Sequence, residues 1–151
     1  MNRFMSSSLF PDVNVWLALS HDGHIHHAIA ADWFRGRDET LFFCRLTQLG
    51  FLRLLTNQQV MGVDVMSQAA AWREYHRWFE DERIEFHQEP DGPEFETLFQ
   101  EFSSRGHRSP KLWADAYLAA FARAAGLTLV TFDRGFEVIP SVRAVILRGD
   151  S

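Results

Sequence analysis

The sequence predicts an α/β fold with a mainly parallel central sheet. Short apolar runs typical of buried strands alternate along the chain with longer amphipathic segments typical of helices. The 151 residues suit one domain, and 46% of them are hydrophobic, which is enough to build a core around such a sheet. Strands that alternate with helices pair in parallel through right-handed crossovers.

The expected strands are short and apolar. The first covers 8–12 and ends near Asp12. The second, at 41–44, is apolar throughout, as expected for a strand covered on both faces. Further strands are expected at 84–86, 127–131 and 142–147.

Helices are expected between these strands. Ile29 and Trp33 lie four residues apart and share one face, and Ser67 fits an N-cap. A loop is expected around Met61 and Gly62. The helices expected in the first two thirds of the chain cover 14–19, 26–34, 45–55, 67–79 and 93–102.

The last third carries the clearest helix signals. Ser109 fits an N-cap, Pro110 the first helical position, and Gly126 the residue that ends a helix. The helix between them would be about 24 Å long at 1.5 Å per residue. We expect residues 8–151 to form a single domain and residues 1–7 to be a flexible N-terminus.

Composition excludes several classes of protein. The N-terminus lacks the apolar run of a signal peptide, and no apolar stretch reaches the roughly 18 residues of a membrane span, so we expect a cytoplasmic protein without a membrane partner. The single cysteine, Cys44, cannot form an internal disulfide and argues against a thiolate zinc site.

The charge distribution is uneven. The net charge of −5 by itself argues against a nucleic-acid partner. The segment 80–101, however, holds nine acidic residues against one arginine, so the rest of the chain carries a net charge of +3. Arg105, Arg108 and Lys111 lead into the last long helix, where an RNA backbone can lie. We expect the acidic segment to face away from the functional site.

Three aspartates stand where an open parallel sheet binds ligands. Asp12 closes the first strand, Asp133 follows the strand at 127–131, and Asp115 lies on the helix between Pro110 and Gly126. Converging carboxylates repel one another, and a hard cation such as Mg²⁺ or Mn²⁺ relieves that repulsion. The alternative is that each is a turn-forming or solvated residue without a catalytic role.

Four segments resemble, in order and spacing, the motifs of PIN-domain proteins, and the resemblance is strongest to the VapC-type toxins of bacterial toxin–antitoxin pairs. It covers about 9–147. The segments are Asp12-Val13-Asn14-Val15-Trp16, the helical run 46–54, Trp113-Ala114-Asp115-Ala116-Tyr117-Leu118 and Thr131-Phe132-Asp133-Arg134-Gly135-Phe136.

This resemblance implies a PIN-like three-layer α/β/α sandwich and a Mg²⁺-dependent endoribonuclease, with Mn²⁺ as an alternative cation. The activity implied is cleavage of RNA by attack of a metal-activated water on a phosphodiester. The resemblance also implies a homodimer and a small cognate antitoxin that inserts into the active-site groove.

Carried over by position, Asp12, Asp115 and Asp133 match the acidic residues that act as metal ligands and catalytic groups in the family. The polar positions that support such a site are matched by Asn14, Gln48 and Thr131. Gln48 is a departure, because many relatives have Glu in this helix. Its amide removes one formal negative charge, which predicts weaker metal binding and leaves the number of metal ions, one or two, open.

Lys111 precedes Asp115 by four residues, which places both on one helix face. Two interpretations remain open: a surface ion pair, or an ammonium group that contacts a substrate phosphate. Arg108 is a second candidate for the phosphate contact.

Two weaker signals favour structural roles. His21, His24, His26 and His27 straddle a glycine turn and do not share one helical face, which favours solvated polar residues over a metal site. The stripe formed by Trp72, His76 and Phe79 favours packing, because a base-stacking platform needs exposed rings on a basic surface.

Two other functions compete with the nuclease. A PIN scaffold that binds RNA or its antitoxin without cleaving is favoured by Gln48. An aspartyl-phosphate phosphatase or receiver-like domain needs paired aspartates, and the sequence Asp12-Val13-Asn14 offers a single carboxylate.

Overall fold

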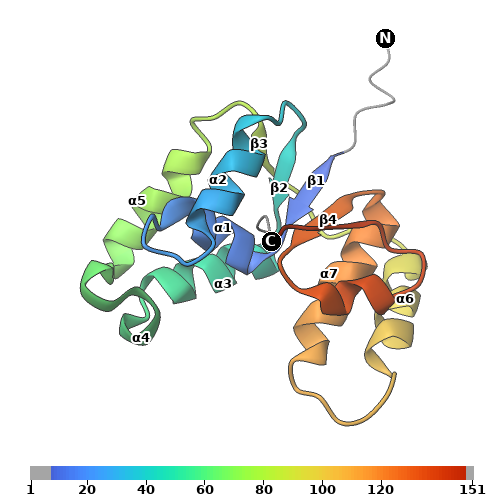
Figure 1. Cartoon of the computed structure of the whole chain (residues 1–151). Coiled ribbons are helices and arrows are strands. Elements are labelled where there is room, and N and C mark those ends of the chain that lie inside the picture. The colour runs from blue at the N-terminus through green and yellow to red at the C-terminus, as the bar shows by residue number, and fades with distance from the viewer. Residues whose placement is uncertain (1–7, 149–151) are drawn as a thin grey trace.

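The computed structural model describes residues 8–148 and arranges them around one parallel sheet (Figure 1). The prediction of a flexible segment at 1–7 lies outside the described residues. The strand order is β3-β2-β1-β4-β5, and every neighbouring pair is parallel. All five expected strands are present; β3 has the expected bounds, and the other four are one to three residues shorter than expected. They are β1 (Leu9–Pro11), β2 (Leu41–Phe43), β3 (Ile84–Phe86), β4 (Thr128–Thr131) and β5 (Ala144–Ile146).

Helices cover both faces of the sheet, which confirms the three-layer α/β/α sandwich (Figure 1). One layer contains α1 (Val13–Ser20), α2 (His27–Arg35), α3 (Arg45–Leu55) and α5 (Gln68–Trp78). The other contains α6 (Pro93–Ser103) and α7 (Leu112–Ala125). No helix within residues 8–148 combines the length and apolar character that crossing a bilayer requires.

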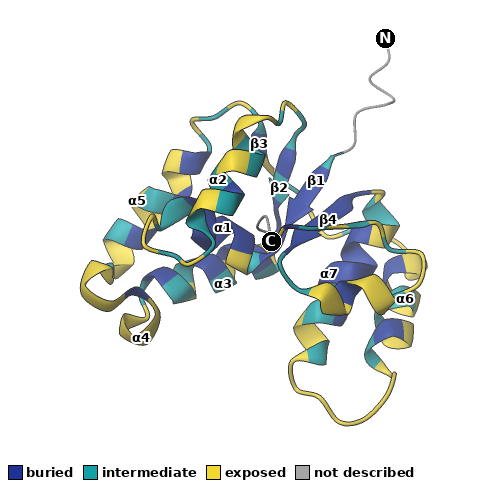
Figure 2. Cartoon of the chain, in the orientation of Figure 1, coloured by how far each residue is buried: buried dark blue, intermediate teal, exposed yellow. Residues whose placement is uncertain are grey.

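Alternate side chains of the strands divide the core into two halves. Leu9 and Val130 pack with the layer of α1, α3 and α5, whereas Phe10 and Leu129 pack with α6 and α7. In the first half, Trp16 is fully buried and stacks on the ring of Phe43, with 3.9 Å between ring centroids. Figure 2 shows the strands as the buried centre of the molecule, with exposed residues on the outer faces of the helices.

Local signals predicted most helix ends but not the start of α7. Ser67 caps α5 through the Ala70 N–H, at 3.1 Å, and Gly126 ends α7 with a φ of +72°, as expected. The prediction that Ser109 caps the helix and Pro110 begins it is wrong. The helix begins at Leu112, whose N–H bonds the Ser109 carbonyl in a turn. Proline fits the second position of such a turn as well as a first helical turn, so the sequence signal is the same for both.

Three short helical segments were not expected. The predicted loop around 61 and 62 instead contains α4 (Gln58–Met61) and the 3₁₀ turn η2 (Gly62–Asp64), and Asn57 caps α4. A second 3₁₀ turn, η3 (Arg134–Val138), follows β4. Segments of one turn are too short for hydrophobic periodicity to show them.

The strand β1 stays paired with β4 but separates from β2 at its carboxyl end. It pairs with β4 over three residues and with β2 only at Leu9↔Leu41. Pro11 explains the difference, because it has no N–H to donate to the β2 side. The direction in which successive strands are added reverses between β1 and β4, and such a switch point is where parallel sheets bind ligands.

Candidate active site

The three predicted aspartates lie together at this switch point. Asp12 follows β1, Asp133 follows β4, and Asp115 projects from the first turn of α7. They share one cavity of about 210 Å³ with Asn14, Lys111, Thr131 and Phe132. Residues that are far apart in the sequence meet here because the carboxyl ends of adjacent parallel strands lie at one edge of the sheet.

Asp12 is held rigidly and is only 8% exposed. One carboxylate oxygen accepts the Val15 N–H at 3.2 Å, which caps α1, and the other accepts the Thr131 hydroxyl at 2.5 Å. Burial raises the pKa of Asp12 to about 6, and the nearby charge of Asp115 adds to this, although the hydrogen bonds act in the opposite direction. The hydrogen bonds of Asp12 therefore do not fully offset the cost of burying its negative charge, and a bound cation would reduce that cost.

Thr131 connects two of the aspartates. Its fully buried hydroxyl donates to Asp12 and accepts the backbone N–H of Asp133 at 3.0 Å. Asp133 in turn accepts the Gly135 N–H at 2.7 Å and so begins η3. A single threonine thus fixes the spacing between the end of β1 and the segment that follows β4.

Lys111 bridges Asp115 and Asp133. Its ammonium group donates to the Asp115 carboxylate and, at 2.9 Å, to the Asp133 carboxylate. Partial burial lowers the pKa of Lys111, but the two carboxylates outweigh this and hold it above its usual value. The Lys111 hydrogen bond, with that of Gly135, lowers the pKa of Asp133. The ion pair with Asp115, one of the two interpretations that the sequence left open, is present, and it includes a second carboxylate that spacing did not indicate.

The oxygen donors of this cavity suit a hard divalent cation. Three carboxylates with neighbouring hydroxyl and amide groups are the ligands that Mg²⁺ and Mn²⁺ prefer. Within the described residues, no three His, Cys, Asp or Glu side chains are already arranged to hold a metal ion. The Lys111 ammonium engages both Asp115 and Asp133. The chemistry of the donor set therefore fits a divalent cation, which would compete with the Lys111 ammonium for Asp115 and Asp133.

The structure does not bring Gln48 to the aspartates. Its side chain accepts a 2.6 Å hydrogen bond from Arg45 and contacts Tyr75, in a separate hollow between α3 and α5. The side of α3 that faces Asp12 and Asp115 carries Leu46, Leu49, Gly50 and Arg53 instead. Successive residues of a helix are rotated by about 100°, so Gln48 points away from the aspartates although its neighbour Leu49 faces them.

This placement predicts that Gln48→Glu leaves Mg²⁺ affinity unchanged, whereas Leu49→Glu increases it severalfold. Leu49 is 52% exposed and lines the hollow that also contains Asp12 and Asp115, so a carboxylate at this position adds negative charge beside them. Calorimetric titration with Mg²⁺ compares the two variants with the unmodified protein. A larger gain from Gln48→Glu than from Leu49→Glu contradicts the placement.

Glycine at position 50 prevents α3 from supplying a carboxylate there. A Cβ on Gly50 would lie 2.8 Å from Cγ2 of Val13, in the first turn of α1. The close approach holds α1 against α3 and so positions Asp12, which caps α1.

One residue beside the aspartates, Arg53, was not identified from the sequence. Arg53 lies in the hollow of about 250 Å³ beside the aspartates. Its spacing of seven residues from Leu46 places both on the same face of α3, and this was the signal in the sequence. His26 packs on Phe132 with 4.6 Å between ring centroids, and His24 lies 6.4 Å from the same ring. Two of the four histidines therefore lie beside Phe132, which lines the aspartate cavity. Arg108 is exposed and lines a different hollow, in the loop before α7.

Comparison with known proteins agrees with this architecture. The family model described as "PIN domain" matches residues 9–141. The chain is 41% identical over 134 residues to ribonuclease VapC41 of Mycobacterium tuberculosis, covering 85% of this chain and 90% of that protein. It is 35% identical over 141 residues to ribonuclease VapC38 of the same species, covering 87% and 89% of the two chains.

Solved structures share the fold at low sequence identity. VapBC2 from Rickettsia felis, bound to a DNA fragment from its promoter, superposes with a TM-score of 0.65 at 12% identity, over 93% of this chain and 98% of that one. Mycobacterium tuberculosis VapC20, described as a sarcin-ricin loop cleaving toxin, has a TM-score of 0.62 at 18% identity, over 90% and 99%. The five-stranded parallel sheet, the family match and the identity to the VapC ribonucleases agree, and this chain belongs to the PIN domain family, in its VapC group.

Proposed function

We propose that this protein is a Mg²⁺-dependent endoribonuclease that acts as the toxin of a cytoplasmic toxin–antitoxin pair, with Mn²⁺ as a substitute cation. The observation that carries the proposal is the convergence of Asp12, Asp115 and Asp133 in one cavity at the β1/β4 switch point. The relatives named ribonuclease VapC support RNA as the substrate class.

The side chains of the cavity divide the work between them. Asp12, Asp115 and Asp133 would hold the cation, and Thr131 keeps Asp12 in place through its hydrogen bond. A bound divalent cation lowers the pKa of a water molecule and neutralises the charge that develops at a phosphodiester. We assign to Lys111 a contact with a phosphate oxygen once it has left the carboxylates, and to Asn14, which is exposed at the mouth of the cavity, a polar contact with the substrate. The expected products carry a 5′-phosphate and a 3′-hydroxyl.

The partners proposed are RNA, a small antitoxin and a second copy of the chain. Neighbouring structures described as VapBC, from Rickettsia felis and Salmonella typhimurium, support an antitoxin partner. The alternative is a non-catalytic PIN scaffold that binds RNA or the antitoxin. Gln48 itself lies outside the aspartate cavity, but α3 places no carboxylate beside Asp12 and Asp115, so the cleavage experiment below has to separate the two functions.

Incubation of the purified protein with a structured RNA tests the proposal. We expect cleavage with Mg²⁺, none with EDTA, and none by Asp115→Asn. Mapping of the product ends should find 5′-phosphates. Cleavage that persists in EDTA overturns the metal-dependent mechanism, and intact RNA under every condition favours a binding protein without catalysis.

A further inference from the structure

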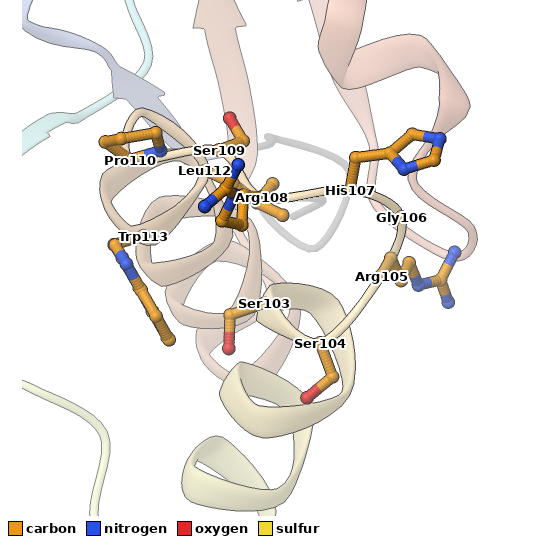
Figure 3. A pocket seen from close by; sticks show the side chains of 10 residues that line it. All are labelled: Ser103, Ser104, Arg105, Gly106, His107, Arg108, Ser109, Pro110, Leu112 and Trp113. Atoms are coloured by element: carbon orange, nitrogen blue, oxygen red, sulfur yellow. The ribbon is translucent and has the colours of Figure 1, made fainter.

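The loop between α6 and α7 forms a hollow with a basic and aromatic lining, here called the α6–α7 hollow (residues 103–110 with Leu112 and Trp113). Its volume is about 470 Å³. Figure 3 shows Trp113 on one side of it and Arg105 and His107 on the opposite side, with Arg108 between them. The mechanism above uses no side chain of this hollow, although the sequence made Arg108 a candidate for a phosphate contact.

The indole of Trp113 is unusually accessible for a large aromatic side chain. It is 61% exposed, although it lies in the first turn of α7, and two residues further along the helix Asp115 lines the aspartate cavity. Arg105 makes one ion pair, at 3.4 Å to Glu101, and among the described residues Arg108 pairs with no carboxylate. The hollow therefore presents an exposed ring among cations, which is the combination that a base-stacking platform needs.

The α6–α7 hollow is connected to the aspartate cavity through shared lining residues. A second hollow of about 350 Å³ lies between them. It shares Arg105, Gly106 and Leu112 with the α6–α7 hollow. It shares Lys111, Asp115 and Asp133 with the aspartate cavity. A chain molecule with a phosphate at the aspartates can therefore extend along this surface without leaving it.

The distribution of charge favours RNA over a protein segment as the occupant. None of the nine acidic residues of 80–101 lines the aspartate cavity or either of the two hollows that lead from it. The positive groups instead follow the track, from Lys111 through Arg105 to Arg108. A polyanion gains from each of these groups, because every neutralised phosphate releases counterions.

We propose that the α6–α7 hollow is a nucleotide subsite for single-stranded RNA, in which an unpaired base stacks on Trp113 while Arg105 and Arg108 hold the adjoining backbone phosphates. The proposal rests on the nuclease function above and assigns it a substrate-binding surface beyond the aspartates. An unpaired base is required, because a base within a duplex has no free face to offer the indole.

Binding of a fluorescein-labelled 12-nucleotide single-stranded RNA, measured by anisotropy in EDTA, tests the subsite apart from catalysis. Trp113→Ala is expected to weaken binding about tenfold, within the range for one base–aromatic stack, while Trp113→Phe retains most of the affinity. The matched control is Trp72→Ala, because Trp72 is also exposed, at 44%, but lies on α5 and stacks on His76. Arg108→Gln should weaken binding and reduce the salt dependence by about one counterion.

The outcomes separate the subsite from the nuclease. Equal RNA affinity of Trp113→Ala and the unmodified protein overturns the subsite, and the nuclease stands if Mg²⁺-dependent cleavage persists. A change of oligomeric state in Trp113→Ala with unchanged RNA affinity also overturns it and assigns the surface to protein contacts. Failure of the unmodified protein both to bind and to cleave RNA overturns both proposals.

Discussion

Asp12→Asn is expected to reduce RNA cleavage by about 10³-fold or more, which corresponds to the loss of several kcal/mol of transition-state stabilisation. The same substitution is expected to stabilise the folded protein. The loss of activity follows from the removal of a central carboxylate from the cavity shared with Asp115 and Asp133. Asparagine caps helices as well as aspartate does, so α1 should keep its cap.

The gain in stability follows from the raised pKa of Asp12. Its pKa is about 6 in the folded protein against 3.8 for the free side chain. Between these values the folded state binds more protons than the unfolded state, so the free energy of unfolding falls as the pH rises from about 4 to about 6. Above that window the buried anion costs about 2 to 3 kcal/mol, and Asp12→Asn does not carry this cost.

Urea denaturation in EDTA at a series of pH values measures this effect. The variant and the unmodified protein should have similar stability near pH 4 and differ by about 2 to 3 kcal/mol at pH 7. Asp115→Asn is the control. It should lose activity without the gain in the free energy of unfolding, because its partner Lys111 is left with one carboxylate. Lower stability of Asp12→Asn at pH 7 contradicts the description of Asp12 as a buried anion whose hydrogen bonds do not fully offset the cost of its burial.

Lys111→Met is expected to raise Mg²⁺ affinity about tenfold, the equivalent of roughly 1.4 kcal/mol. The ammonium group engages Asp115 and Asp133, so a cation held by these two carboxylates would have to displace it. Removal of the competing charge favours Mg²⁺, and it also leaves the two carboxylates to repel each other when no metal is bound.

Calorimetric titration with Mg²⁺ and thermal unfolding without metal test this prediction together. Lys111→Arg retains the charge and should resemble the unmodified protein in both measurements. If Lys111→Met lowers RNA affinity while Mg²⁺ affinity is unchanged, Lys111 contacts only the substrate and does not compete with the metal ion.

The sequence was sufficient to predict the convergence of the aspartates, because the position of a residue relative to a strand end is a robust signal. Asp12 and Asp133 follow β1 and β4, and these two strands are adjacent in the sheet. The parallel arrangement itself followed from the alternation of strands and helices. The order of strands within the sheet, which places the switch point between β1 and β4, is a tertiary property that periodicity does not contain.

Predictions that depended on the rotation of a helix were less successful. Gln48 and Leu49 are neighbours in the sequence, but only Leu49 lies beside the aspartates. The start of α7 was placed two residues early, and this matters for Lys111, which precedes the helix and reaches Asp133 as well as Asp115. The exposure of Trp113 had no sequence signal, because a tryptophan among alanine and leucine residues is typical of a buried face.

Diffraction from crystals grown with Mn²⁺, recorded near the manganese absorption edge, tests the central claim most directly. We predict an anomalous peak among the carboxylates of Asp12, Asp115 and Asp133, with the Lys111 ammonium moved away from Asp115 and Asp133. A protein that cleaves RNA with Mn²⁺ but shows its manganese peak elsewhere, with Lys111 still bridging the two aspartates, would contradict the assignment of this cavity as the catalytic metal site.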